Sequence, residues 1–313
     1  MQSRAGDTTL PLLERLWIYQ AERFPLFRTA LLLAAFSAAS LNVSAFLAGR
    51  PLPSAWPYVA IWLVLLVVFF QMRAADEWKD LETDRRYRPE RPIPRGLVTL
   101  RGVVTLALGL VPIALALAAS VAPQLVLLLC LVWLWLAAMT VEFGMPDWLK
   151  ARPIVYLASH MLIMPLIDLF VTGAEWLPAG GYPPDGLWLF LALSFVNGCV
   201  LEIGRKIYAP ASERAGVETY TAAWGLQTAV WVWSGCLVLS CALLVMLGVR
   251  LGVGAGIALV TGIALVVALA VAWTFMRSPT PARQKAIDTL AGLWVLACYG
   301  LAGGLPLMRG AVP

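Results

Sequence analysis

Long apolar segments separated by short polar connections dominate the pattern of the chain. Nine of these segments have about 18–25 residues, the length that a helix needs to cross roughly 30 Å of hydrocarbon. They cover residues 26–48, 57–75, 98–121, 123–144, 152–174, 186–207, 226–248, 251–274 and 286–308. A segment without a paired strand can satisfy its backbone hydrogen bonds inside a membrane only as a helix. The pattern therefore predicts an all-α, polytopic integral membrane protein with a bundle of about nine transmembrane helices.

The segment of residues 1–25 is polar at first and then amphipathic, and we separate it from the single nine-helix domain of residues 26–313. As a helix, it would turn these apolar side chains to lipid: Leu13, Trp17 and Ile18. It would turn these charged side chains to water: Glu14, Arg15, Glu22 and Arg23. The pattern predicts a helix on the membrane surface, with a partner-binding helix as the less favoured alternative. The segment lacks the pattern of a cleavable signal peptide.

Charged residues make up only 13% of the chain, against 61% hydrophobic residues, and their positions predict the topology. If the N-terminus is cytoplasmic, all but three of the 23 Lys and Arg residues lie on the cytoplasmic side, and the exceptions are Arg50, Arg250 and Arg309. The positive-inside rule therefore predicts a multi-pass protein with a cytoplasmic N-terminus, in the cytoplasmic membrane if the cell is bacterial. This topology accounts for the net charge of +5, so we predict no nucleic-acid partner, and nothing predicts an obligatory protein partner.

The segment of residues 73–101, RAADEWKDLETDRRYRPERPIPRGLVTLR, concentrates charge at one membrane edge. On a helix, Asp76, Asp80 and Asp84 would form one column at i, i+4 and i+8, with Glu77 beside it. Such like charges repel each other unless a cation binds among them. Mg²⁺ prefers ligands of this kind, usually one or two carboxylates together with phosphate oxygens and waters. The carboxylates therefore favour a magnesium site.

Arginines follow these carboxylates directly, at Arg85, Arg86, Arg88, Arg91, Arg95 and Arg101. Guanidinium groups bind phosphate oxygens bidentately. Carboxylates, Mg²⁺ and arginines together describe a site for a diphosphate. On charge alone, the segment is equally compatible with a solvated cytoplasmic loop whose acids pair with neighbouring bases.

The segment resembles the first aspartate-rich motif of the UbiA superfamily of intramembrane prenyltransferases. The family pattern is NDxxDxxxD followed by a segment like NRPxRPIPSG, and this chain has DEWKDLETD followed by RYRPERPIPRG. Three positions differ, because Asp76 stands for the family's Asn, Glu77 for its first Asp, and Arg95 for its usual Ser. The resemblance implies a nine-helix prenyltransferase fold with Mg²⁺ as cofactor and a modified metal geometry.

A second polar cluster, SFVNGCVLEIGRKIYAPASERAGVETYTAAWG, lies on the same predicted side of the membrane. Its resemblance to the family is looser, because the second acidic motif would fall near Tyr208 and Ser212, which are not acidic. Either Glu202 supplies a metal ligand after a shift of the helix, or Arg205 and Lys206 neutralise the diphosphate where the family uses a metal. An ordinary ion pair between Glu202 and Lys206 at i, i+4 is the structural alternative.

The loop after the fourth apolar segment holds Glu142, Lys150 and Arg152. In the UbiA family this loop often carries a tyrosine and a lysine near the diphosphate. The resemblance gives Lys150 the place of that lysine, whereas Glu142 or Phe143 stands where the tyrosine would be. Membrane anchoring by positive charge explains Lys150 and Arg152 equally well.

Polar residues inside apolar segments are further candidates. His160, the only histidine, and Asp168 share one face of the fifth segment. His160 could take a proton from an acceptor substrate, although a hydrogen bond to a neighbouring helix is the more usual role. Asp168 is nearer the outer end, where we expect it to be solvated. For Asn42 in the first segment, we favour a helix–helix hydrogen bond over a ligand contact.

We therefore predict a Mg²⁺-dependent enzyme that ionises an isoprenyl diphosphate and transfers the prenyl group to a lipophilic acceptor, either an aromatic ring or a hydroxyl group. The predicted catalytic residues are Asp76, Asp80 and Asp84. The predicted metal ligands are Asp76, Glu77, Asp80, Asp84 and Glu202. The predicted diphosphate ligands are Arg73, Lys79, Arg91, Lys150, Asn197, Arg205 and Lys206. His160 is the candidate base for the acceptor.

Two alternatives stay open. A terpene cyclase of the same superfamily would capture the allylic cation with the double bonds of the prenyl chain itself. A transporter or lipid-binding protein without enzymatic activity is less favoured. His160 and Asp168 could belong to an ion path, but both polar clusters lie on one predicted side of the membrane, which an inverted repeat would not produce.

Overall fold

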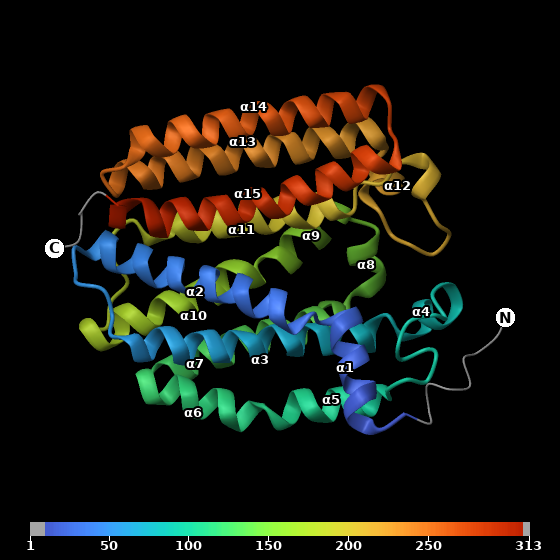
Figure 1. Cartoon of the computed structure of the whole chain (residues 1–313), viewed down its shortest axis with the longest axis horizontal. Coiled ribbons are helices and arrows are strands. Elements are labelled where there is room, and N and C mark those ends of the chain that lie inside the picture. Colours follow the sequence, from blue (N-terminus) through green and yellow to red (C-terminus); the bar gives the residue numbers. More distant parts are fainter. Residues whose placement is uncertain (1–9, 309–313) are drawn as a thin grey trace.

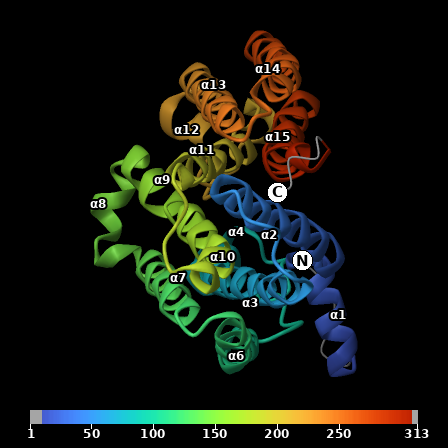
Figure 2. The same cartoon turned by 90° about the vertical axis from the view of Figure 1, so that its left-hand side faces the viewer.

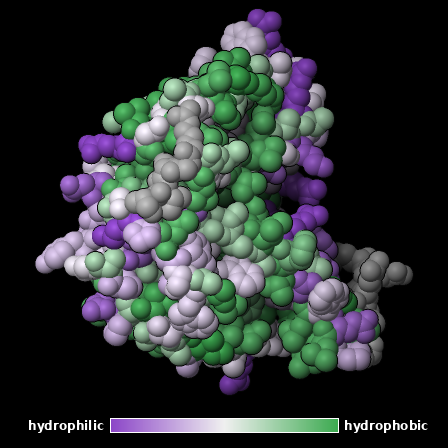
Figure 3. Space-filling view, turned by 60° about the vertical axis from the view of Figure 1, so that its left-hand side comes forward, coloured by the Kyte–Doolittle hydropathy of each residue, from purple (hydrophilic) through white to green (hydrophobic). Residues whose placement is uncertain are grey.

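The computed structural model describes residues 10–308, and all regular secondary structure in that range is helical (Figure 1). The long helices run side by side as one bundle. In Figure 3, hydrophobic residues cover much of the middle of the visible surface, and hydrophilic residues lie mainly toward its margins. The predicted all-α membrane bundle is confirmed. Residues 1–9 of the predicted N-terminal segment, and Arg309, lie outside the described range.

Eight helices or helix pairs in the described range are long and apolar enough to cross a membrane. They are α2 (Leu26–Ala48), α3 (Ala55–Lys79), α5 with α6 (Leu100–Val121), α9 with α10 (Pro153–Ala179), α11 (Leu187–Arg205), α13 (Leu226–Arg250), α14 (Gly254–Arg277) and α15 (Pro281–Met308). The remaining predicted segment forms α7 (Leu125–Thr140), which is apolar but has only 16 residues. At 1.5 Å per residue, α7 is about 24 Å long, which is less than a typical hydrocarbon core. It packs against α6 and α10, so all nine predicted segments belong to the bundle.

Prolines divide two of the predicted segments into helix pairs. The pairs are α5 (Leu100–Gly109) with α6 (Val111–Val121), and α9 (Pro153–Met161) with α10 (Ile163–Ala179). Pro112 and Pro165 lie just after the two interruptions. Proline lacks a backbone N–H, and its ring clashes with the carbonyl four residues earlier. Hydropathy does not register such an interruption, because the flanking residues are all apolar.

Shorter helices complete the chain. They are α1 (Leu12–Arg23), α4 (Leu81–Tyr87), α8 (Pro146–Lys150) and α12 (Tyr220–Trp224), with single 3-10 turns at Glu142–Gly144 and Pro210–Ser212. Helices α4, α8 and α12 gather at one end of the bundle, on the right of Figure 1.

Helix α2 joins the two halves of the bundle. Figure 2 shows it between the group of α11, α13, α14 and α15 and the group of α3, α6, α7 and α10, and it contacts α3, α10 and α15. Its crossing with α15 is close, since a Cβ atom on Gly303 would lie 2.4 Å from the Cα atom of Ala39. Glycine is therefore required at this position for the two backbones to approach each other.

Buried hydrogen bonds also join these helices. The Asp168 carboxylate on α10 is fully buried and accepts hydrogen bonds from Ser40 Oγ at 2.7 Å and from Tyr299 Oη at 2.6 Å. The expectation that Asp168 is solvated is wrong, because α2, α10 and α15 close around it and hydroxyl donors replace water. The favoured role of Asn42 is confirmed, since its Nδ2 donates to the Gly303 carbonyl at 3.1 Å.

Helix α1 packs against the bundle through one face. Leu13 and Trp17 are exposed, as predicted for contact with lipid. Ile18 packs instead against a buried cluster that contains Leu97, so the prediction that it faces lipid is wrong. Arg15 also turns inward, with its Nε donating to the Leu97 carbonyl at 2.5 Å. The hydrophobic pattern of α1 could not distinguish a face that meets lipid from one that meets protein.

Candidate active site

Both polar clusters of the sequence meet at the end of the bundle that carries α4, α8 and α12 (Figure 1). Helix α3 ends there at Lys79, and α11 ends there at Arg205. The acidic segment and the second cluster are distant in the sequence but lie on the same side of the bundle, as the topology predicted.

A pocket of about 580 Å³ opens between these elements. It is lined by Thr83 and Tyr87 of α4, by Lys150, Pro153 and Tyr156 around α8 and α9, and by Lys206, Gly216, Val217, Glu218, Thr219, Tyr220, Ala222 and Ala223 after α11. The structure thus brings together Lys150 and Lys206, two of the predicted diphosphate ligands. Three tyrosines that the sequence analysis did not select also line the pocket, namely Tyr87, Tyr156 and Tyr220.

The three predicted catalytic aspartates do not lie on one unbroken helix. Helix α3 extends to Lys79, farther than hydropathy predicted, so Asp76 lies in its last turn. The helix is interrupted at Asp80, and Asp84 lies on α4. Asp76 is exposed, whereas Asp84 is buried. The regular column expected from the spacing is replaced by three different environments.

Asp84 anchors the arginine-rich turn that follows α4. Arg91 Nη1 lies 2.5 Å from Asp84 Oδ2, and Arg88 Nη1 lies 3.5 Å from Oδ1. The backbone N–H of Leu97 closes the turn by donating to the Pro92 carbonyl at 2.9 Å. Asp84 and Arg91 neutralise each other here, so their predicted roles as metal and diphosphate ligands would require this ion pair to open.

Glu77 is buried and faces α1. Its Oε1 lies 2.6 Å from Arg23 Nε and 3.4 Å from Arg73 Nε, so two guanidinium groups compete with any metal for this carboxylate. Arg73, a predicted diphosphate ligand, also lies 3.5 Å from Asp76. In the same corner, burial and then the charge of Glu77 raise the pKa of Tyr19 to about 12, so this hydroxyl stays neutral.

Asp76 and Asp80 are the carboxylates of the motif that are least engaged. Asp76 has only the distant contact with Arg73, and its charge interacts across the site with Arg205 of α11. The Asp80 side chain makes no ion pair or side-chain hydrogen bond within the described part of the chain, although it is partly buried. These two carboxylates, one helical turn apart, are available to a ligand.

The donor set is compatible with a magnesium ion that binds together with its substrate. Across residues 10–308, no three His, Cys, Asp or Glu side chains lie close enough together to hold a metal by themselves. Mg²⁺ commonly uses one or two carboxylates and completes its shell with phosphate oxygens and waters. Asp76 and Asp80 fit this pattern, whereas Glu77, Asp84 and Glu202 already have cationic partners.

The second cluster divides between the pocket and the packed core. Glu202 is nearly buried and pairs with Arg205 at 2.7 Å and with Lys206 at 2.8 Å, and the second of these pairs is the structural alternative that the i, i+4 spacing offered. Asn197, one of the predicted diphosphate ligands, is buried among the helices and accepts a hydrogen bond from Ser240 Oγ at 2.7 Å. It does not line the pocket.

The loop after α11 is organised by its own side chains. The Glu213 carboxylate accepts a hydrogen bond from Thr221 Oγ1 at 2.6 Å, which fixes the start of α12. Lys206 Nζ lies 5.9 Å from the centre of the Tyr220 ring, within the range of a cation–π contact. Burial, and next the charge of Glu202, raise the pKa of the Tyr220 hydroxyl. Tyr220 is therefore a neutral hydrogen-bond donor at the pocket wall.

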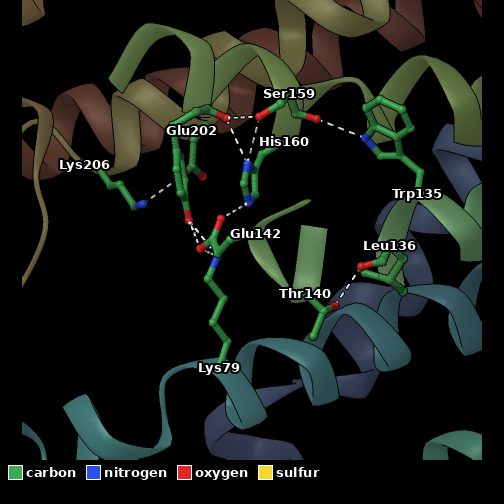
Figure 4. Close-up of polar contacts among 10 residues, drawn as sticks. Lys79, Trp135, Leu136, Thr140, Glu142, Ser159, His160, Glu202 and Lys206 are labelled. Carbon is green, nitrogen blue, oxygen red and sulfur yellow. Dashed lines mark hydrogen bonds and ion pairs between the residues drawn. The ribbon is translucent and has the colours of Figure 1, made fainter. Parts of the chain in front are cut away.

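A cluster of four residues lies behind the part of the wall that Tyr156 lines, and Figure 4 shows the contacts of Lys79, Glu142 and His160 in it. It consists of Lys79, Glu142, Tyr156 and His160, and we call it the Glu142 cluster. Lys79 Nζ pairs with Glu142 and lies 2.6 Å from Tyr156 Oη. Tyr156 Oη in turn donates to Glu142 Oε1 at 3.1 Å. Lys79, a predicted diphosphate ligand, is therefore engaged with this cluster, and Tyr156 is the member that lines the pocket.

His160 supports Tyr156 from the protein side. The two rings stack, with centroids 4.0 Å apart and planes inclined by 12°. His160 Nδ1 lies 2.9 Å from the Tyr156 carbonyl oxygen. His160 does not line the pocket, so its predicted role as acceptor base has no direct contact with the space where an acceptor would lie.

Glu142 and Phe143 have left-handed backbone conformations, with φ values of 52° and 53°. Each such residue other than glycine costs about 1–3 kcal/mol. Phe143 lies against the rings of Trp135 and His160, with centroid distances of 5.3 and 6.0 Å. These contacts, together with the partners of the Glu142 side chain, hold the strained turn between α7 and α8.

Sequence reasoning missed the tyrosines of the pocket for an identifiable reason. Charge marks a polar residue in an apolar chain, whereas an aromatic residue there usually serves packing. Tyr156 follows Lys150 at the start of the next apolar segment, and Tyr87 lies within the arginine run. An aromatic hydroxyl among predicted phosphate ligands was the available signal. Glu142 was recognised only as a departure from the family pattern.

Comparisons with known proteins agree on the fold. The model of the UbiA prenyltransferase family matches residues 31–297. The apo structure of a UbiA homologue from Aeropyrum pernix K1 superposes with a TM-score of 0.66 and 18% identity, and the alignment covers 88% of this chain and 97% of that one. The structure of a digeranylgeranylglyceryl phosphate synthase has a TM-score of 0.58 and 14% identity, with 88% and 98% coverage. A UbiA homologue from Archaeoglobus fulgidus bound to DMAPP and Mg²⁺ has a TM-score of 0.55 and 12% identity, with 90% and 98% coverage.

No curated protein sequence matches the chain closely enough to identify a relative. The family model nevertheless spans most of the chain, from the second turn of α2 to the second half of α15. It includes both polar clusters and every residue that lines the pocket. With the bundle and the polar end of α3 as described, the chain belongs to the UbiA prenyltransferase family.

Proposed function

We propose that the protein is a Mg²⁺-dependent intramembrane prenyltransferase, which ionises an isoprenyl diphosphate and transfers the prenyl group to a lipophilic acceptor. One observation carries the proposal: Lys150 and Lys206 line a pocket beside the end of α3, where Asp76 and Asp80 have little engagement with other groups. Cations and free carboxylates at one end of an apolar bundle suit a diphosphate head on a hydrocarbon chain. The homologue with bound DMAPP and Mg²⁺ supports the same reading.

In this mechanism the residues of the pocket bind and orient the diphosphate. Lys150 and Lys206 would contact its oxygens, and Tyr220 would donate a hydrogen bond to it. As the allylic C–O bond breaks, negative charge grows on the leaving group, and fixed cations at that position lower the barrier. Asp76 and Asp80 would hold a Mg²⁺ ion, which would supply further positive charge near the leaving group. The surrounding apolar helices would keep water away from the allylic cation.

We also propose on which side of the membrane the pocket opens. Most Lys and Arg residues lie at the pocket end under the predicted topology, which supports a cytoplasmic active site. The diphosphate donor would then come from the cytoplasm, and its prenyl chain would extend into the bundle.

Diphosphate release by the purified protein tests this function. We would offer geranyl, farnesyl and geranylgeranyl diphosphates with Mg²⁺, or with EDTA, to the wild type, to Asp80→Asn and to Glu82→Gln. Glu82 is the matched control, because its carboxylate lies in the same segment but is exposed, and within residues 10–308 it pairs with Arg85 alone. We expect release that requires Mg²⁺, a decrease of about 100-fold or more in Asp80→Asn, as for lost transition-state stabilisation, and little change in Glu82→Gln.

The organic product then identifies the fate of the allylic cation. A prenylated acceptor supports the transferase, whereas a cyclic terpene formed without acceptor would show a cyclase. If the rate of diphosphate release is the same with EDTA as with Mg²⁺, and the same in Asp80→Asn as in the wild type, the proposed site is wrong. If no donor is ionised with any acceptor supplied, the proposed enzymatic function is wrong.

A further inference from the structure

Glu142 connects three elements behind the Tyr156 side of the pocket, and Figure 4 shows its contacts with Lys79 and His160. Its buried carboxylate lies in the turn between α7 and α8, and it contacts Lys79 of α3 and both Tyr156 and His160 of α9. None of the comparisons assigns a role to this residue. Glu142 is only 6% exposed, and burial of an unpaired charge is strongly unfavourable. Its three polar partners therefore stabilise the carboxylate in this position.

The backbone conformation at Glu142 indicates that the contacts of its side chain stabilise this turn. A residue with φ of 52° is at a position that glycine adopts most easily, and Gly144 in the same turn has φ of 73°. The turn would therefore form more easily with glycine at position 142. Glutamate pays a conformational penalty there, and its contacts with Lys79, Tyr156 and His160 hold it in place.

Tyr156 transmits the position of Glu142 to the pocket. Of the four residues in the Glu142 cluster, Tyr156 alone lines the cavity. Its hydroxyl accepts a hydrogen bond from Lys79 and donates one to Glu142, while its ring is stacked on His160. The orientation of Tyr156 is thus fixed at both the ring and the hydroxyl.

The contact between Glu142 and His160 requires a proton. His160 Nδ1 lies 2.9 Å from the Tyr156 carbonyl oxygen and 3.3 Å from Ser159 Oγ, and we assign its proton to Nδ1 because a carbonyl oxygen can only accept. Its Nε2 lies 3.3 Å from Glu142 Oε2, and neither of these two atoms makes a hydrogen bond elsewhere within residues 10–308. With Nδ1 as the donor, two lone pairs would repel at that separation, so this tautomer requires one further proton on the pair. With Lys79 counted, the cluster then carries one net positive charge behind the pocket.

We propose that Glu142 is a positioning residue for diphosphate binding, which holds Lys79 behind the pocket, orients Tyr156 at the pocket wall and shares one proton with His160. The inference deepens the proposed function, and it rests on that function only in requiring that the pocket takes a diphosphate. The charged groups that act on His160 are Lys79 of α3, Glu142 and Glu202 of α11, and the backbone carbonyl of Tyr156 on α9 contacts its ring.

Binding of inorganic diphosphate with Mg²⁺ to the purified full chain tests the proposal without turnover. We would compare Glu142→Gly, which removes the side chain where glycine suits the backbone, with Glu142→Gln, which keeps an oxygen acceptor. Asp147→Asn, an exposed acid in the nearby helix α8, is the matched control for loss of one negative charge. Melting temperatures of all variants are measured in parallel.

We expect affinity to fall about tenfold in Glu142→Gly, the loss that a hydrogen bond to a charged group typically represents. Glu142→Gln should lie between Glu142→Gly and the wild type, and Asp147→Asn should match the wild type. If Glu142→Gly and Glu142→Gln bind like the wild type, or differ from it only in melting temperature, the positioning role is excluded.

The shared proton has its own readout. Affinity of the wild type should decrease as pH rises and this proton leaves, because the cluster then loses its positive charge. His160→Gln, whose amide donates to Glu142 at any pH, should lack that decrease. Identical pH profiles would overturn the shared proton. If the wild type binds diphosphate but ionises no prenyl donor, the proposed function is wrong, and the binding data of the variants still test the role of Glu142. If the wild type binds no diphosphate, both proposals are wrong.

Discussion

Carboxylates that look equivalent in the sequence have different surroundings in the folded chain. Asp80 is without an ion-pair partner in the described part of the molecule, whereas Asp84 is held by Arg91 and Glu77 by Arg23. The spacing of the motif predicts that these acids approach one another. It does not predict their counter-ions, because those depend on how the arginine-rich turn and α1 fold back.

This difference predicts opposite effects of two substitutions. Asp84→Asn should lower the free energy of unfolding by about 1–3 kcal/mol, since it leaves a partly buried arginine without its partner. Asp80→Asn should leave stability unchanged and remove the Mg²⁺ dependence of diphosphate binding. Thermal unfolding and Mg²⁺ titrations of both variants provide the comparison. A stable Asp84→Asn protein without Mg²⁺ dependence would instead identify Asp84 as a metal ligand.

At the scale of elements, the site is built from helix ends and the loops between them. Gly216, in the loop after α11, lies against the Tyr87 ring of α4, so the two polar clusters touch at the pocket. A Cβ atom on Gly216 would lie 2.3 Å from Tyr87 Cδ2. Loop sequences indicate where glycine permits a turn, but the ring that excludes a side chain comes from a distant helix.

Gly216→Ala should therefore disturb the pocket more than a matched glycine substitution. Both Gly216 and Gly225 have positive φ, at 75° and 82°, but nothing lies within 4 Å of a Cβ atom on Gly225. Gly225→Ala should lower stability by about 1 kcal/mol through backbone strain alone. Gly216→Ala should in addition displace Tyr87 and weaken diphosphate binding several-fold, which calorimetry can measure. Equal binding by the two variants would contradict the contact.

At the scale of the whole molecule, α2 and its crossing with α15 hold the two halves of the bundle together. The buried Asp168 network and the close approach at Gly303 both lie along this interface. Without a hydrophobic driving force between helices in lipid, such packing and hydrogen bonds determine the assembly. The pocket depends on it, because α3 and α11 belong to different halves.

Two adjacent glycines of α15 test this interface. A Cβ atom on Gly303 would meet the Ala39 backbone of α2, while one on Gly304 meets nothing within 4 Å. Gly303→Ala should destabilise the protein by about 1–3 kcal/mol through overpacking. Gly304→Ala should be neutral or slightly stabilising, because alanine is the better helix former. Thermal unfolding in detergent compares them, and equal melting temperatures would show that the helices separate easily here.

The sequence by itself determined the membrane class, the order of the nine apolar segments and the placement of both polar clusters at one end of the bundle. These properties follow from local quantities, namely the length of apolar runs and the distribution of charge. The interruptions of the helices at Leu110 and Leu162 also have a local cause, the prolines that follow them, but hydropathy does not detect such interruptions.

Only the tertiary structure decided which charged groups are free and which neutralise each other. Three examples depend on residues that are far apart in the chain. Glu77 pairs with Arg23, Asp168 is buried against Ser40, and the strained turn at Glu142 is held by Lys79. An ion pair depends on distances of a few ångströms between separate elements, and no local pattern specifies those distances. For that reason the sequence indicated the chemistry of the site, and the fold selected the residues available to perform it.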